Sequence, residues 1–425
     1  MTSKYQAAGI NALIYIYIYI SLLFGFILFK MYMIFYPYIS SYDSINQWNQ
    51  IHGLLSYNRI HSIGHTIFLK GLLSIYDDFI IVVLFQLVGI SAVYLLFSNY
   101  FLSKGFPLWS VAAVFAVSLI TDSPAELIYF YPFKDTPAAL CICLITLILI
   151  KYNEEYKISS FSSAVLGLAL AWCWLFRLNG VIAFCVMGTY FVLSFIKRRY
   201  FRQLSLMLAA IILSVSFVNI YADKCLKPAE YENGFSIQVF ASGIAAMVDS
   251  GELSDEELDK IDELISVDWM KSHYSRYYKN PLIWGHDDPP FAFDDPNLEI
   301  FNNKFVLDLG ANKWEVVKLY FELMPKHLSV CIKDVFGSLL MMWNTPLMFP
   351  SSYLFQVVTI AFLAVSARLK LKDSIVFLPS LCNTVSIMIS TITNESRYLL
   401  PAYMLMPVFF LYVVRKNSEY KEQKC

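Results

Sequence analysis

Long apolar runs are the feature that most constrains this chain. Ten stretches are mostly apolar and close to the roughly 20 residues needed to cross a hydrocarbon core of about 30 Å. Backbone polar groups in lipid must be paired within the chain, which favours a helix even for the alternating Tyr-Ile stretch that begins at Tyr15. Hydrophobic residues make up 58% of the 425 residues, and the mean hydropathy is +0.55. The sequence therefore predicts an all-α polytopic membrane protein with about 10 transmembrane helices.

The apolar runs divide the chain into three parts. We expect a transmembrane module over residues 1–221, a small extracytoplasmic domain over 222–350, and further transmembrane helices with a cytoplasmic tail over 351–425. No small-residue cleavage site follows the first run, which predicts a retained anchor. The predicted spans are residues 12–34, 79–100, 106–121, 137–151, 160–176, 179–196, 203–221, 351–367, 374–392 and 398–414.

Cationic residues set the predicted sidedness. If the N-terminus is cytoplasmic, fifteen lysine and arginine residues fall in cytoplasmic segments and five in the short outer loops. Because positive charge collects on the inner side, this bias predicts a plasma-membrane protein with both termini in the cytoplasm. The net charge of −1 and the absence of a nucleic-acid motif argue against a nucleic-acid partner.

The segment 222–350 is the longest polar region, and it holds 21 of the 33 acidic residues. Within it, Ser254 and Glu257 have the spacing of a capping box that opens an amphipathic helix over 254–265. Residues 330–343 could form an eleventh span. That span would place the basic ARLKLK string outside, so we expect an interfacial helix on the outer surface instead.

Ionisable residues gather in the outer loops that this topology predicts. Such residues are expensive at the bilayer centre, so we expect them to pair with one another or to line a wet cavity. Each also has a simpler interpretation: a helix cap for Asp43, a membrane anchor for Lys134, and structural ion pairing for the arginines. The residues are Asp43, His61, His65, Glu126, Lys134, Asp135, Arg177 and Arg397.

His61 and His65 are four residues apart, a spacing that two ligands on one helical face would have. Gly64 lies between them and no HExxH glutamate is present, which weakens a zinc interpretation. Asp43 opens a polar stretch that predicts a juxtamembrane helix over about 43–57, with Gln47 one turn further on.

These strings together resemble the GT-C superfamily of membrane glycosyltransferases. The similarity lies in an acidic residue beside an outer juxtamembrane helix, here Asp43, and in the strings YPFKD, FRLNG and ESRYLLP. It covers residues 10–221 and 351–414. The resemblance implies transfer of a sugar from a polyprenyl-phosphate donor to an extracytoplasmic glycan, lipid or protein acceptor. The chain departs from the commonest pattern because Asp43 stands alone, without a second adjacent acid.

The resemblance also implies roles for the outer residues. Asp43 is the expected base for a single, inverting displacement. A divalent cation, Mg or Mn, would take oxygen ligands from Glu126 and Asp135. The donor phosphate would be bound by Arg397, Arg177 and Lys134, and the substrate would be oriented by His61, His65 and Gln47.

Other protein classes stay open at this point. A transporter or flippase of a lipid-linked or polar substrate is the main alternative, although transporters place charge near the midplane on broken helices. A glycan polymerase would have a similar number of spans and would join whole repeat units. A purely structural membrane protein is the remaining alternative.

Overall fold

The computed structural model describes eight parts of the chain: residues 42–57, 62–121, 132, 134–227, 237–274, 304–335, 371–390 and 400–422. These residues fold almost entirely into helices, and no strand occurs among them. The predicted all-α class is confirmed for this described portion. Predicted spans 12–34 and 351–367 lie outside the described residues.

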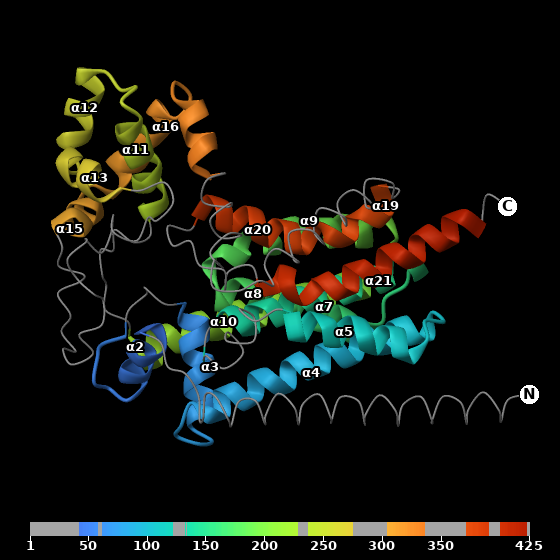
Figure 1. Cartoon of the computed structure of the whole chain (residues 1–425). Helices are drawn as coiled ribbons and strands as arrows, with labels where there is room; N and C mark the ends of the chain where they lie inside the picture. The colour runs from blue at the N-terminus through green and yellow to red at the C-terminus, as the bar shows by residue number, and fades with distance from the viewer. Residues whose placement is uncertain are drawn as a thin grey trace, which may run out of the picture.

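One group of long helices lies side by side as a bundle (Figure 1). Two shorter helices, α2 (Tyr42–Ile51) and α3 (Ile63–Leu73), lie at one end of it. The bundle itself contains α4 (Ile80–Ser103), α5 (Leu108–Thr121), α7 (Asp135–Glu155), α8 (Ser160–Phe176), η1 (Leu178–Gly180), α9 (Val181–Lys197), α10 (Phe201–Tyr221), η2 (Ala222–Leu226), α19 (Leu371–Ser374), η5 (Ile375–Phe377), α20 (Leu378–Ser390) and α21 (Leu400–Glu422).

Four helical segments are long and apolar enough to cross a membrane: Ile80–Ser103, Asp135–Glu155, Leu178–Lys197 and Phe201–Leu226. These helices indicate an α-helical membrane protein. The described residues of the other eight predicted spans are mostly helical, but only the four segments above have the length and hydropathy of a crossing, so the number of ten spans stays a prediction. The span predicted to end at residue 221 continues as a π-helical turn, η2, through Leu226.

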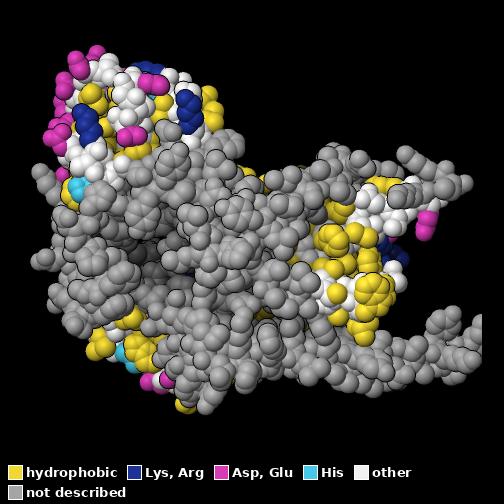
Figure 2. Space-filling view, viewed as in Figure 1, with side chains coloured by type: hydrophobic (Ala, Val, Ile, Leu, Met, Phe, Trp, Pro, Cys, Tyr) yellow, Lys and Arg dark blue, Asp and Glu magenta, His cyan; other side chains and the backbone are white. Residues whose placement is uncertain are grey.

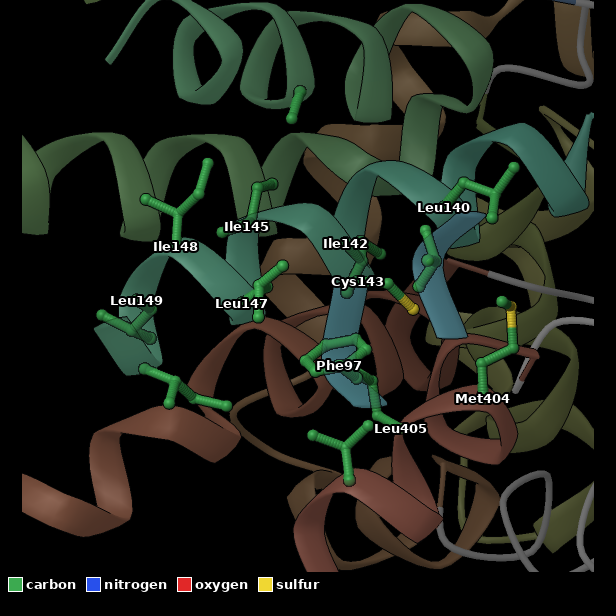
Figure 3. Packing of buried hydrophobic residues seen from close by; sticks show 14 of the residues in the cluster. Phe97, Leu140, Ile142, Cys143, Ile145, Leu147, Ile148, Leu149, Met404 and Leu405 are labelled. Carbon is green, nitrogen blue, oxygen red and sulfur yellow. The ribbon is translucent and has the colours of Figure 1, made fainter. Parts of the chain in front are cut away.

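Helix α7 is the centre of the bundle. The apolar stretch of α7 is 83% buried. The corresponding stretch of the segment Phe201–Leu226 is only 22% buried, so this segment lies at the periphery. Figure 3 shows buried side chains along α7 beside Phe97 of α4 and Met404 and Leu405 of α21. The bundle core consequently joins helices from both predicted transmembrane parts of the chain.

A smaller helical unit has a hydrophobic core of its own. It is built from α11 (Gln238–Ser250), α12 (Asp255–Asp262), α13 (Val267–His273), α15 (Lys304–Ala311), α16 (Lys313–Leu323) and the helical residues 328–335. The predicted capping box is confirmed, because Ser254 Oγ accepts from Glu257 N while the Glu257 carboxylate accepts from Ser254 N. The helix ends at Asp262, earlier than the predicted residue 265, and both Ile261 on it and Ile265 just after it are buried in the core.

The bundle has two polar ends. We call the end that carries α2 and α3 the α2 end, and the end where α4 and α7 finish the α21 end (Figure 1). Because α7 has 21 residues, the two ends are separated by about 30 Å. That distance matches the hydrocarbon thickness of a bilayer.

At the α21 end, Glu154 of α7 lies among cationic and hydroxyl groups. It accepts hydrogen bonds from Tyr100 of α4 and Arg415 of α21, and Lys104 Nζ lies 2.9 Å from its second oxygen. Lys416 of α21 lies 3.8 Å from both Glu154 and Asp373. The charges here are paired with one another and connect α21 to α4 and α7.

Candidate functional site

Helix α2 ends earlier than predicted. The predicted juxtamembrane helix reached residue 57, whereas α2 ends at Ile51. Gly53 takes a left-handed φ of 75°, the Leu54 N–H donates to Asn49 O at 2.8 Å, and the Gly53 N–H donates to Gln50 O at 3.3 Å. This is the Schellman termination that glycine favours because it has no Cβ.

Asp43 lies within the first turn of α2. The simpler interpretation of Asp43 as the cap of this helix is therefore wrong, because the helix has already formed at Tyr42. A carboxylate in a first turn is favourable beside the positive end of the helix dipole. The side chain of Asp43 lies outside what the structure describes, so its role as a base stays a prediction.

Gln47 of α2 and His65 of α3 form a buried hydrogen-bonded pair. The Gln47 amide nitrogen donates to Thr66 Oγ1 at 3.0 Å, which leaves its carbonyl oxygen facing His65 Nδ1, also at 3.0 Å. Nδ1 must then be the protonated ring nitrogen that donates to Gln47. All three residues are less than 3% exposed. The pair thus fixes both the ring orientation of His65 and the contact between α2 and α3.

Helix α3 is held tightly against the end of α8. A Cβ built on Gly64 would lie 2.5 Å from Leu175 O, so only glycine permits this approach. Ser62 Oγ donates to Phe176 O, and the His65 ring meets the Phe176 ring edge-on with centroids 6.3 Å apart. This contact explains why residue 64 is a glycine. The same glycine weakened the zinc interpretation of His61 and His65.

Arg177 and Asp135 form a buried ion pair at the same end. Asp135 is the first residue of α7, and Arg177 follows the last residue of α8 with extended backbone angles (φ −150°, ψ 123°). That break between α8 and η1 carries the guanidinium group to the Asp135 carboxylate. The two residues are 8% and 2% exposed, so each charge is balanced in a largely dehydrated place.

Lys134 and Ser44 are two further residues at the start of α7 and on α2, respectively. Lys134 directly precedes Asp135 as the N-cap residue of α7 and is partly exposed. Ser44 of α2 is buried, and its hydroxyl donates to Pro132 O at 3.5 Å. This contact connects α2, with Asp43 on it, to the chain that leads into Asp135.

The predicted site residues therefore divide into three groups. The structure brings Asp135 into contact with Arg177 and Gln47 into contact with His65, and Lys134 directly precedes Asp135 at the start of α7. The backbone of Asp43 lies on α2. Outside the described residues lie His61, Glu126 and Arg397.

Asp135 was predicted as a ligand of a divalent cation. Across the described parts of the chain, no group of three or more His, Cys, Asp or Glu side chains is arranged to hold a metal ion. A cation beside Asp135 would have to share its carboxylate with Arg177. Metal binding by Asp135 with Glu126 stays a prediction. The contact between Arg177 and Asp135 is the geometry that structural ion pairing requires.

His52 is a residue of this end that sequence reasoning missed. Its ring stacks on Trp48 with centroids 4.2 Å apart, Nδ1 lies 2.9 Å from Trp48 O, and Nε2 lies 2.8 Å from Asp77 Oδ1. The hydrogen bond to Trp48 O and the Asp77 carboxylate raise the pKa of His52 above its ordinary value of 6.5. The i, i+4 spacing of Trp48 and His52 was the available signal.

No known protein family, curated protein or solved structure matches this chain. Interpretation of the site accordingly rests on the residues at the α2 end and their geometry.

Proposed function

We propose that this chain is a membrane glycosyltransferase of the GT-C type. It moves a sugar from a polyprenyl-phosphate donor to an extracytoplasmic glycan, lipid or protein acceptor, with inversion at the anomeric carbon. The observation that carries this proposal is the position of α2, which bears Asp43, at the same end of the bundle as Lys134 and the Asp135–Arg177 pair. A carboxylate that could accept a proton and cationic side chains that could bind a phosphate thus share one end.

The reaction requires few groups from the protein. The donor's leaving group is a phosphate, which needs charge stabilisation and no strong acid. The acceptor hydroxyl must lose its proton as its oxygen attacks the anomeric carbon and the carbon–phosphate oxygen bond breaks. Asp43 is the proposed base for that proton, and the product retains the new glycosidic bond while the polyprenyl phosphate departs.

Cationic residues would bind the donor phosphate. Arg177, Arg397 and Lys134 are the proposed ligands, because a planar guanidinium group can donate two parallel hydrogen bonds to phosphate oxygens. The ion pair with Asp135 supports this role for Arg177 by holding its side chain in one orientation before the donor arrives.

The buried amide and imidazole groups would shape the rest of the site. His65 is held by Gln47, so we assign both to positioning of the sugar-bearing part of the site, together with His61. A divalent cation, if bound, would supply further charge for the phosphate, with Asp135 and Glu126 as its proposed oxygen ligands.

Replacing the proposed base tests the catalytic assignment. Asp43→Asn should lower the rate of donor consumption roughly 10²-fold or more, because general-base contributions are of that size. The rate is measured on purified protein with a polyprenyl-phosphate sugar that the wild-type chain consumes. Asp259→Asn, on the exposed face of α12, is the matched control and should keep the wild-type rate. A correctly inserted Asp43→Asn protein with full activity would remove Asp43 from the mechanism.

A further inference from the structure

Helix α16 and the helical residues 328–335 have a second, exposed apolar side. Their buried side chains, such as Val316 and Leu323, belong to the core of the small unit. On the exposed side lie Trp314 (72% exposed), Phe321 (55%), Leu328 (50%) and Ile332 (47%), which we call the Trp314 stripe. Trp314 and Phe321, seven apart on α16, share one side of that helix, and Leu328 and Ile332, four apart, share one side of the helical residues 328–335.

A turn over residues 324–327 joins the two helical segments that carry the stripe. His327 N–H donates to Leu323 O at 3.1 Å, and Cys331 N–H donates to His327 O at 3.3 Å. The stripe thus consists of four exposed apolar side chains on two consecutive helical segments joined by a short turn. Exposed apolar side chains grouped in this way mark a contact with another phase or another molecule.

Charge on the small unit is distributed unevenly. The segment 313–335 has four lysines (Lys313, Lys318, Lys326 and Lys333) against three acids (Glu315, Glu322 and Asp334), and Lys313 Nζ lies 5.5 Å from the Trp314 ring centroid. Helix α12 carries five acids and one lysine in the sequence DEELDKID. In Figure 2, acidic side chains crowd the edge of the unit over α12, whereas hydrophobic and cationic side chains meet at the edge over α16.

The sequence on either side of the stripe indicates which surface the stripe contacts. After Asp334 no charged residue occurs until Arg368, so the chain passes from the stripe into a long uncharged segment. The small unit is also joined at its beginning to α10 and η2, which form one of the four helical segments able to cross a membrane. Both connections keep the unit within reach of the bilayer surface.

We propose that the Trp314 stripe is a membrane-contact face that seats the small unit on the surface of the lipid bilayer. Trp314 lies at the level of the headgroups, where tryptophan is enriched. Phe321, Leu328 and Ile332 enter the boundary of the acyl chains, and Lys313, Lys318 and Lys333 meet lipid phosphates, whereas Lys326 is paired with Glu257 of α12. The acidic face of α12 is directed to water. This contact requires membrane insertion of the bundle and does not depend on the proposed sugar chemistry.

Fluorescent labels on the full-length protein test this placement. The environment-sensitive dye NBD is attached at Phe321→Cys, and at Asp259→Cys on α12 as the matched control, in a chain whose Cys185, Cys225 and Cys425 are serine. The protein is placed in nanodiscs that contain phosphatidylglycerol and phosphatidylcholine, with or without a lipid carrying a nitroxide near its headgroup. Quenching by that lipid and by iodide in the water is measured for each label.

The label at position 321 should have blue-shifted emission, strong quenching by the nitroxide lipid and a several-fold smaller iodide quenching constant than the label at 259. A label at Ile332→Cys should behave in the same way and serves if Phe321→Cys does not fold. Iodide quenching of the 321 label equal to that at 259 overturns the proposal. Shielding from iodide without nitroxide quenching also overturns it, because a protein partner or a second copy would then cover the stripe.

Discussion

Arg177 has two possible roles at the α2 end: a structural partner of Asp135, and a ligand of the donor phosphate. A break in helical backbone between α8 and η1 is used to bring this side chain to Asp135. Removing one member of a buried ion pair leaves an uncompensated charge, whereas removing both leaves none. Stability and activity can therefore be separated at this pair.

Arg177→Gln should destabilise the protein by about 3–5 kcal/mol, the usual cost of stranding a buried charge. The double variant Arg177→Gln/Asp135→Asn should recover most of that stability. It should not recover donor consumption, because the phosphate ligand is still missing. Thermal unfolding in detergent and the donor assay measure the two quantities. A double variant that regains full activity would show that Arg177 is only structural.

The exposed pair of Lys260 and Glu256, with its two atoms 2.9 Å apart, is the control for this comparison. Lys260→Gln should leave the unfolding midpoint unchanged, because solvent screens charges at an exposed position.

His52 gives the α2 end a defined dependence on pH. Its folded-state pKa is raised above 6.5 by the hydrogen bond to Trp48 O and by Asp77. The protonated form is thus favoured by folding, and its contribution to stability is complete below the unfolded-state pKa and is lost as the pH rises through the folded-state pKa.

The unfolding midpoints of wild type and His52→Gln should therefore differ most at acidic pH and converge at alkaline pH. Thermal scans from about pH 5.5 to pH 8.5 cover the titration range of histidine. Asp77→Asn, which removes the carboxylate partner, should reduce the same acidic-side difference. A difference between wild type and His52→Gln that is constant with pH would contradict this account.

Among the helices, α3 carries the contact that positions His65. Its Gly64 touches the backbone of α8 at Leu175, so an added methyl group must push the two helices apart. Gly64→Ala should cost about 1–3 kcal/mol, as overpacking usually does. Donor consumption should fall with it, because His65 and Gln47 move together.

Gly71 of the same helix is the matched control, since a Cβ built there meets nothing within 4 Å. Gly71→Ala should be neutral or slightly stabilising, because alanine is the better helix former. Thermal unfolding of both variants gives the comparison. Equal effects of the two substitutions would argue against a special contact at Gly64.

The helices were predictable from sequence to the extent that their determinants are local. Apolar length and composition located the long helices, four of which could cross a membrane, and the Ser254–Glu257 spacing located the start of α12. The end of α2 was missed, although Gly53 carried the signal for a left-handed termination. The pairing of Arg177 with Asp135, and of His65 with Gln47, was beyond sequence reasoning because helix packing decides which distant side chains meet.

The whole molecule combines a bundle that has two polar ends with a small unit that has its own core. Charges at the α21 end pair with one another around Glu154. At the α2 end, α2 carries the residue proposed to take a proton and lies at the same end as Lys134 and Arg177, which are proposed to bind phosphate. We place the chemistry at the α2 end because the proposed base and the proposed phosphate ligands Lys134 and Arg177 share that end.

Consumption of a lipid-linked sugar tests the central claim most directly. Purified protein in liposomes is incubated with a panel of polyprenyl-phosphate sugars, with and without a chelator, and release of free polyprenyl phosphate is measured. The account predicts that wild type and Asp259→Asn consume at least one donor, and that Asp43→Asn does so roughly 10²-fold more slowly. Release of no polyprenyl phosphate from any donor would contradict the account and favour transport of a lipid-linked substrate.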